Sequence, residues 1–330
     1  MMLPEPRSSD FTPARVVHRP SGNCIDIGLL NNMPDAALES TERQFRALLD
    51  AAAPRGVAVR LRLFALPGLP RGDAGREYAS RHDDIAALWK TRLDGLIVTG
   101  TEPRSPSLEE EPYWHSLTQV MDWAEDNTHS SVWSCLAAHA AVLHLDGIKR
   151  QPLADKRFGI FDSSPSSNDP LTAASPSSVR MPHSRWNDLP ESDLIARGYR
   201  VMLRSAAGAD AFTKQRKSLF VFFQGHPEYD ADTLLLEYRR DVKRFLRGER
   251  ETYPPLPHGY FDEETVAALT AIEQRAVVDR REELLADFPD GLSAKVRNTW
   301  GPGAAFLYRN WLRYLFTQKA QRLKATSRQA

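Results

Sequence analysis

The chain has 330 residues, 42% of them hydrophobic, and its 43 lysine and arginine residues balance its 43 aspartate and glutamate residues. Because the net charge is zero, nothing favours nucleic acid or an anionic membrane as a partner, and we expect neither. The chain begins without an apolar leader, and no later stretch approaches the roughly 20 apolar residues of a membrane span, so a cytoplasmic protein is expected.

The first half of the chain alternates between strand-like and helix-like segments. Residues 24–30 form a short apolar run, residues 39–53 have the spacing of an amphipathic helix, and residues 57–66 alternate with the period of a strand. After these, we expect a helix at 78–93, a buried strand at 94–100, a helix at 111–126, a strand at 130–134 and a helix at 136–147. This alternation predicts an α/β fold with an open, mostly parallel sheet and helices on both faces.

The second half of the chain continues the alternation after an irregular segment. Residues 162–178 are rich in serine and proline and predict a surface loop. Residues 218–230 form an apolar strand that ends in a polar cluster, and residues 233–248 predict a helix. A C-terminal helical extension is expected at 304–318, with a core-facing stripe of Phe306, Trp311, Leu312 and Leu315. We expect one domain over 23–320, flanked by flexible segments at 1–22 and 321–330.

The cysteine content limits the chemistry that the chain can use. The two cysteines, Cys24 and Cys135, lie far apart, which argues against a disulfide framework and against a cysteine-rich metal site. The sequence also lacks clustered histidine and cysteine ligands and a Walker-type phosphate loop, so we expect no metal and no nucleotide hydrolysis. Packing or nucleophilic chemistry remains for Cys135.

Reactive side chains follow two of the predicted strands. Cys135 lies between a strand and a helix, where the free N–H groups of the helix N-terminus favour a thiolate. His226 and Glu228 follow the strand that starts at residue 218. Because ligands gather at the carboxyl ends of parallel strands, both groups can share one crevice. A Cys-His-Glu triad placed there would serve acyl transfer.

Structural interpretations of the same residues stay open at this point. Cys135 can be a small buried residue at the start of a core helix, and His226 a hydrogen-bonded loop histidine. His139 lies one turn beyond Cys135, but a base on the same helix does not easily reach a sulfur at the helix mouth. His183 is ambiguous, and Trp133 and Trp123 are most simply core residues.

Several separated motifs resemble one enzyme family. The segments NNMPD, DGLIVTG followed by EPYW, KRFGIF, MPHSRW, QGHPEYDADTLLLEYRRD and RNWLRYLF occur in the order found in homoserine O-succinyltransferases. The resemblance extends from about residue 24 to residue 318, and it implies a class I glutamine-amidotransferase-like, flavodoxin-like fold and a homodimer. It also implies that Cys135 is the nucleophile, His226 the general base and Glu228 the residue that orients it.

The resemblance further implies a reaction and its substrates. The family transfers an acyl group from an acyl-CoA co-substrate to homoserine, in methionine biosynthesis, with no bound cofactor. Its substrate contacts fall on Lys156, Ser184 and Arg240. A backbone N–H from Leu136, with a second from Gly100 or Thr101, would form the oxyanion hole.

The identities of both substrates are open at this stage. Succinyl-CoA and acetyl-CoA are both possible donors, and L-serine or another hydroxy amine can replace homoserine as acceptor. Arg104 falls where the family has its acyl-selecting residue, and a guanidinium there favours a dicarboxylic acyl donor. A glutamine-amidotransferase-like hydrolase and a binding protein on an inactive enzyme fold are the other candidates.

Overall fold

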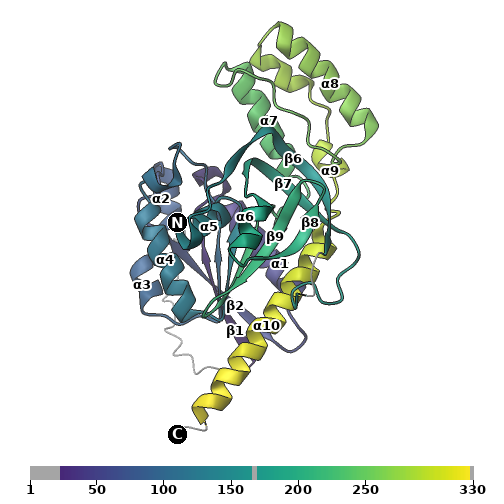
Figure 1. Ribbon diagram of the computed structural model, residues 1–330. Helices are drawn as coiled ribbons and strands as arrows, with labels where there is room; N and C mark the ends of the chain where they lie inside the picture. The colour runs from purple at the N-terminus through teal and green to yellow at the C-terminus, as the bar shows by residue number, and fades with distance from the viewer. Residues whose placement is uncertain (1–22, 166–168, 328–330) are drawn as a thin grey trace, which may run out of the picture.

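A computed structural model describes residues 23–165 and 169–327 of the chain. These residues form a sheet with the strand order β3-β2-β1-β4-β5-β10-β9-β8-β6-β7 (Figure 1). The strands are β1 (Cys24–Leu30), β2 (Ala58–Ala65), β3 (Asp83–Asp84), β4 (Gly95–Val98), β5 (Ser130–Ser134), β6 (Gln151–Pro165), β7 (Val179–Asp188), β8 (Arg200–Ser205), β9 (Gly208–Gln215) and β10 (Leu219–Phe223).

The sheet has a parallel part and an antiparallel part. The strands from β3 to β10 in the sheet order pair in parallel, as the alternation of strands and helices predicts. Beyond β10, the pairings β10–β9, β9–β8, β8–β6 and β6–β7 are antiparallel. The carboxyl ends of β5 and β10 lie side by side, because Ser134 is in register with Phe223. The residues that follow these two strands therefore meet at one edge.

Helices cover both faces of the sheet, which confirms the predicted fold class. The α-helices are α1 (Leu38–Ala52), α2 (Asp73–Ala79), α3 (Ile85–Trp89), α4 (Trp114–Asn127), α5 (Leu136–Asp146), α6 (Glu191–Ala196), α7 (Thr233–Leu246), α8 (Glu263–Val278), α9 (Leu292–Lys295) and α10 (Gly301–Ser327). Short 3-10 helices are η1 (Asp35–Ala37), η2 (Leu108–Glu110) and η3 (Glu282–Asp287).

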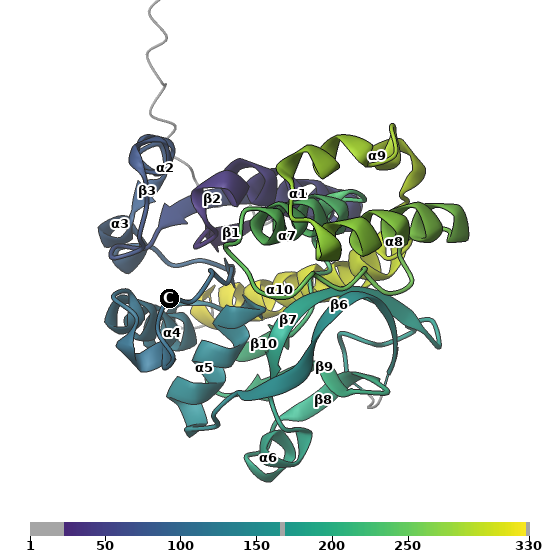
Figure 2. The ribbon, with the colours of Figure 1, turned by 90° about the horizontal axis from the view of Figure 1, so that it is seen from above.

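Two hydrophobic layers enclose the parallel strands. On one face, α4 and α5 pack against Trp133, Phe220 and Phe222, while α1 and α10 pack on the opposite face (Figure 2). Trp133 is fully buried and stacks on Phe220, as expected of a core residue, and Trp123 is half-buried against the same layer. These layers fix the positions of β5 and β10 beneath the site described below.

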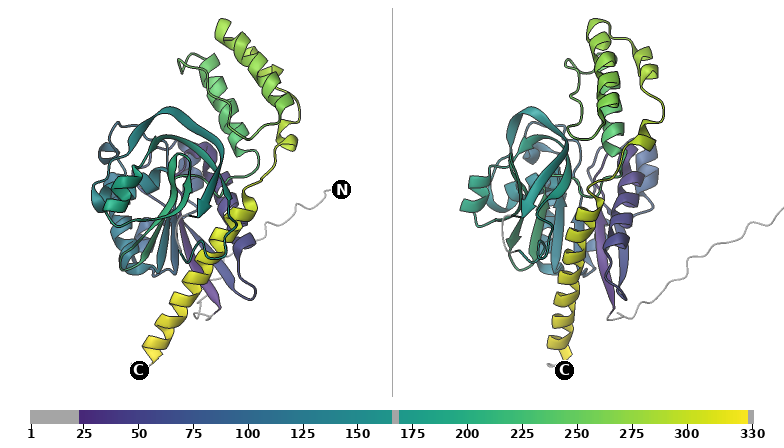
Figure 3. Two further views of the ribbon diagram at one scale, coloured as in Figure 1. Left: turned by 45° about the vertical axis from the view of Figure 1, so that its right-hand side comes forward. Right: turned by 90° about the vertical axis from the view of Figure 1, so that its right-hand side faces the viewer.

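A third hydrophobic cluster lies beyond the sheet. Helices α7, α8 and α9 project from one end of the molecule, while α10 runs toward the opposite end (Figures 1 and 3). Their buried residues form a separate core with Phe158 and Ile160 of β6. The arrangement brings α7 and β6, which are distant in sequence, to the same edge of the sheet as Cys135.

Several expected boundaries differ in the structure. The single helix expected at 78–93 is replaced by the end of α2, the short strand β3 and α3. The expected loop at 162–178 begins later, because β6 continues to Pro165. Residues 321–327 continue α10 instead of forming a tail. In the apolar stripe that was expected on this helix, Phe306 is only half-buried, whereas its neighbour Leu307 is buried. The segments expected to be flexible at 1–22 and 328–330 lie outside the described residues, as do residues 166–168.

Candidate active site

The turn between β5 and α5 holds Cys135 in an unusual backbone conformation. Its φ of 52° and ψ of −115° lie in a region that residues other than glycine rarely adopt. The Cys135 N–H donates a hydrogen bond of 2.7 Å to the carbonyl of Phe223, which anchors the turn to the end of β10. Strained strand-to-helix turns of this kind present a nucleophile above a sheet.

His226 and Glu228 form the expected pair just beyond β10. The Nδ1 atom of His226 lies 2.9 Å from Oε1 of Glu228, and both side chains are buried. The Ser134 hydroxyl donates to the same carboxylate oxygen at 3.5 Å. The ring of His226 stacks on Tyr229 with 4.2 Å between centroids, and its backbone N–H donates to the carbonyl of Pro182 at 2.8 Å. These contacts fix the orientation of the imidazole.

The charge state of His226 follows from its neighbours. Burial lowers the pKa of His226, but the charges of Cys135 and Glu228, together with hydrogen bonds to both, hold this pKa well above the ordinary value of 6.5. A protonated imidazole between a sulfur and a carboxylate is the arrangement that supports nucleophilic catalysis by cysteine. The structure therefore brings the three predicted triad residues together.

A cavity of about 390 Å³ opens above this triad. It is lined by Cys135 and His226, and by every residue that was expected in the oxyanion hole or in contact with substrate: Gly100, Thr101, Leu136, Lys156, Ser184 and Arg240. Arg104, the expected acyl-selecting residue, is exposed and lines a neighbouring hollow with Arg71 and Pro103. The structure thus gathers all these site residues except Arg104 in one cavity.

Gly100 is placed to form one wall of an oxyanion hole. A Cβ atom at this position would lie 2.9 Å from the backbone nitrogen of Leu136 and 3.3 Å from the carbonyl oxygen of Ser134. The absence of a side chain leaves space beside the Leu136 nitrogen at the N-terminus of α5, and both residues line the cavity. This geometry suits the stabilisation of a developing oxyanion.

The expected substrate contacts belong to a charged cluster with residues that sequence reasoning missed. Nζ of Lys156 lies 3.0 Å from Asp241, and Arg240 lies 2.9 Å from the same carboxylate. Burial raises the pKa of Asp241, but these two cations lower it below its ordinary value. The Lys156 side chain is only 4% exposed, so Asp241 supplies the counterion that its burial requires.

A second carboxylate organises the other predicted contact. The hydroxyls of Ser184 and Tyr229 both donate to Glu237, the latter at 2.6 Å. Tyr229 also supports the ring of His226, so Glu237 links the Ser184 position to the base. The only sequence signal for these partners is their proximity to Arg240 in the segment LEYRRD.

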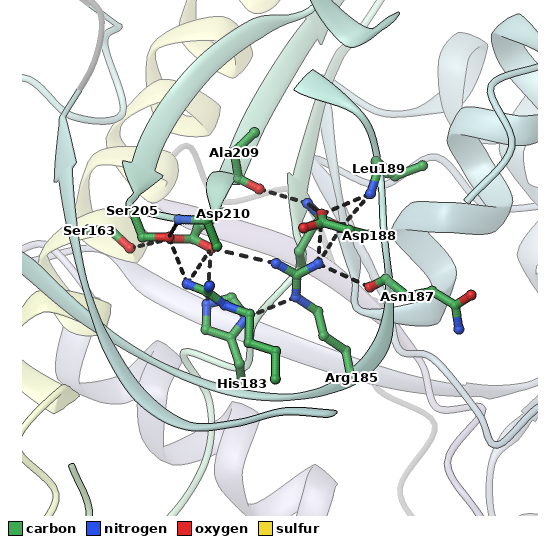
Figure 4. A network of polar contacts seen from close by, with 12 residues as sticks. Ser163, His183, Arg185, Asn187, Asp188, Leu189, Ser205, Ala209 and Asp210 are labelled. Atoms are coloured by element: carbon green, nitrogen blue, oxygen red, sulfur yellow. Dashed lines mark hydrogen bonds and ion pairs between the residues drawn. The ribbon is translucent and has the colours of Figure 1, made fainter. Parts of the chain in front are cut away.

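A buried polar network includes His183, Arg185 and Asp210 (Figure 4). His183 lies 3.3 Å from Asp210, and the Arg185 guanidinium lies 2.7 Å from Asp188 and 3.1 Å from the side-chain oxygen of Gln224. Gln224 precedes His226 by two residues, so the network positions the segment that carries the base. His183, which the sequence left ambiguous, is a fully buried member of this network and does not line the cavity.

His139 lines the cavity but is committed to structure. Its Nε2 atom lies 2.8 Å from the Gln224 side-chain oxygen. Burial lowers the pKa of His139 to about 4, although the hydrogen bond to Gln224 raises it in part.

Across residues 23–165 and 169–327, no three His, Cys, Asp or Glu side chains are grouped to hold a metal ion, and none of the helices has the length and apolar character for crossing a bilayer.

The chain is similar in sequence to proteins of one enzyme family. The family profile described as "Homoserine O-succinyltransferase" matches residues 13–322. The chain is 50% identical to homoserine O-succinyltransferases from Methylorubrum extorquens strain DM4, over 87% of this chain and 86% of the relative, and from Rhodopseudomonas palustris, over 87% of each. A crystal structure of a glutamine amido transferase from Methylobacillus flagellatus, 14% identical, matches 88% of this chain and 95% of its own with a TM-score of 0.49. The chain therefore belongs to the homoserine O-succinyltransferase family.

Proposed function

We propose that this chain transfers a succinyl group from succinyl-CoA to the hydroxyl of L-homoserine through an acyl-Cys135 intermediate. The observation that carries the proposal is the cavity lined by both Cys135, on its strained turn, and His226, which is paired with Glu228. Membership of the family and 50% identity to two homoserine O-succinyltransferases support the choice of substrates.

The first half-reaction acylates Cys135. The thiolate attacks the thioester carbonyl of succinyl-CoA, and the oxyanion accepts hydrogen bonds from the N–H of Leu136 and of Gly100 or Thr101. When the tetrahedral adduct collapses, the bond to the CoA sulfur breaks and the protonated His226 gives its proton to the departing thiolate. The products of this step are acyl-Cys135, neutral His226 and free CoA.

The second half-reaction transfers the acyl group to the acceptor. Neutral His226 removes the proton from the hydroxyl of homoserine as its oxygen attacks the acyl-Cys135 carbonyl. Glu228 stabilises the imidazolium that forms. Collapse of this second adduct breaks the bond to Cys135, restores the thiolate and releases O-succinylhomoserine.

The charged cluster beside the triad suits an amino acid acceptor. Homoserine carries both an α-carboxylate and an α-ammonium group. Lys156 and Arg240 offer cations to the cavity, while Asp241 and Glu237, which also line it, offer carboxylates. The cluster thus complements both charges of a zwitterion.

The remaining expectations form part of the same proposal. Family membership supports a cytoplasmic homodimer that acts in methionine biosynthesis and uses succinyl-CoA as co-substrate without a bound cofactor. Acetyl-CoA as donor and L-serine as acceptor are the competing substrates, and the acyl-selecting role of Arg104 stays a prediction.

The test compares substrates directly. Purified protein is incubated with succinyl-CoA or acetyl-CoA and with homoserine, serine or glutamine, and products are identified by mass spectrometry. We expect O-succinylhomoserine as the main product, no turnover by Cys135→Ala, and no ammonia from glutamine. Faster serine acylation would change the acceptor, and ammonia release at a comparable rate would favour a glutamine hydrolase.

A further inference from the structure

The cations that line the active-site cavity differ in whether they have an acidic partner. They are Arg150, Lys156, Arg185, Arg240, Arg244 and Arg250. Lys156, Arg240 and Arg250 share Asp241, at 3.0, 2.9 and 3.7 Å, while Arg185 pairs with Asp188 at 2.7 Å and Arg244 with Glu102 at 3.1 Å. Within residues 23–165 and 169–327, the Arg150 side chain has no salt bridge and no hydrogen bond, so its charge is available to a ligand.

Arg150 is half-buried, and it lines the same cavity as the nucleophile Cys135. It follows α5 and directly precedes β6. Burial lowers the pKa of Arg150, while the charges of Tyr113, Cys135 and Glu111 raise it. An arginine nevertheless stays protonated in a protein. A partly desolvated guanidinium without a counterion is unfavourable, and an anionic ligand would relieve that cost.

Glu111, an acidic residue whose charge acts on Arg150, is hydrogen-bonded elsewhere through one of its carboxylate oxygens. Oε1 of Glu111 accepts hydrogen bonds from the backbone N–H groups of Arg104 and Ser105, at 2.6 and 2.8 Å. Glu111 is buried, its Oε2 atom has no hydrogen-bond partner, and among the described residues it forms no salt bridge with Arg150. Glu111 therefore holds the loop that follows β4 through Oε1 and does not form an ion pair with the Arg150 guanidinium.

We propose that Arg150 binds the distal carboxylate of the acyl group and so selects a succinyl donor over an acetyl donor. This inference rests on the function proposed above. In a succinyl thioester, two methylene groups separate the reacting carbonyl from the distal carboxylate, so a cation near Cys135 meets that carboxylate. The phosphates of CoA are separated from the thioester by the whole pantetheine arm.

The two cationic regions of the cavity then have separate ligands. Lys156 and Arg240 lie beside carboxylates and form a mixed-charge wall that suits a zwitterionic amino acid. Arg150 has no such partner and suits an anion that carries no nearby positive charge. A guanidinium can hold a carboxylate through two parallel hydrogen bonds, which acetyl-CoA cannot form.

The experiment measures kcat/KM of Arg150→Gln, Arg150→Lys and wild type with succinyl-CoA, acetyl-CoA and butyryl-CoA. Butyryl-CoA has the chain length of succinyl-CoA with a methyl group in place of the carboxylate. We expect Arg150→Gln to lose on the order of 10- to 100-fold with succinyl-CoA, since a charged hydrogen-bond partner is removed, and to change less than about threefold with acetyl-CoA. Arg150→Lys should recover part of the loss.

Two further variants separate the alternatives. Arg104→Gln tests the exposed arginine of the neighbouring hollow, and Arg197→Gln, an exposed arginine after α6, is the surface control. A succinyl-to-acetyl ratio that shifts in Arg104→Gln and not in Arg150→Gln overturns the inference. Equal losses with both donors in Arg150→Gln also overturn it, because they indicate a structural role.

The wild-type protein provides a test that needs no variant. Butyryl-CoA used within about threefold of succinyl-CoA would contradict a cationic acyl site. Failure of the proposed function looks different: wild type would then transfer no acyl group from any donor to homoserine. Transfer of succinyl by wild type with an unchanged donor ratio in Arg150→Gln rejects the role of Arg150 alone.

Discussion

Replacing Gly100 by alanine tests the oxyanion hole with a single methyl group. The added Cβ would lie 2.9 Å from the Leu136 nitrogen, 3.0 Å from the Leu136 Cβ and 3.3 Å from the Ser134 carbonyl oxygen. These neighbours are backbone atoms or a Cβ atom, whose positions the backbone fixes, so no side-chain rotation makes room for the methyl group. The methyl group must displace the backbone or cover the Leu136 N–H. Loss of one such donor costs ~3 kcal/mol in the transition state, about 100- to 1,000-fold in kcat.

The assay follows CoA release in the first turnover, with a thiol-reactive dye, together with steady-state kcat and KM. We expect Gly100→Ala to slow acylation while the KM for succinyl-CoA stays within a few-fold, because the lost interaction forms only in the transition state. Gly147→Ala is the control at the other end of α5, because no atom lies within 4 Å of a Cβ added there. The φ of +68° at Gly147 predicts that this variant loses about 1 kcal/mol of stability without a change in kcat. A kcat for Gly100→Ala within threefold of wild type would refute the proposed oxyanion hole.

Two further predictions concern buried carboxylates. Glu228→Gln should lower kcat by roughly 10³- to 10⁴-fold and lower the pKa of His226, because the imidazolium loses its charge partner. Steady-state kinetics measures the first effect and NMR of the imidazole the second, and an unchanged His226 pKa would contradict the pairing. Asp241→Asn should destabilise the fold by about 3 kcal/mol in urea unfolding at neutral pH, because Lys156 stays buried without its counterion. Since the pKa of Asp241 is lower in the folded state, its contribution to stability is complete above its unfolded pKa and disappears as pH falls through the folded pKa. The stabilities of the variant and of wild type should therefore begin to approach each other below about pH 4 and converge only below the folded pKa. A difference in stability that persisted in acid would assign the effect to packing.

The triad was predictable because its residues follow strands with clear apolar patterns. The segment SLFVFF is short and almost continuously hydrophobic, as buried parallel strands are, while SSVWS has only Val132 and Trp133 as apolar residues and directly precedes a helix-like pattern. The carboxyl ends of neighbouring parallel strands share one edge, so Cys135 and His226 had to lie close together if β5 and β10 paired.

The antiparallel part of the sheet was not predictable in the same way. β6 runs from Gln151 to Pro165, but only Phe158, Gly159, Ile160 and Ser163 are buried. Most of its residues are polar or exposed, and the strand exists because β7 and β8 pair with it. Sequence periodicity reports burial, so strands held mainly by pairing carry a weak signal.

Charged residues of the cavity posed a related difficulty. Lys156 and Asp241 are 85 positions apart, and neither position has a sequence pattern that distinguishes it from a solvent-exposed charge. The same is true of Arg150, whose distinction is the absence of a counterion among the described residues. Which charges are paired depends on tertiary contacts between β6 and α7 that only the fold establishes.

The most direct test of the central claim is the covalent intermediate itself. The protein is mixed briefly with succinyl-CoA in the absence of acceptor, quenched in acid, and analysed by intact-mass and peptide mass spectrometry. The account predicts a mass increase of one succinyl group on the peptide that contains Cys135, and its disappearance when homoserine is added before the quench, with O-succinylhomoserine formed in equal amount. An enzyme that makes O-succinylhomoserine with no adduct on Cys135, or with full activity in Cys135→Ala, would contradict the account.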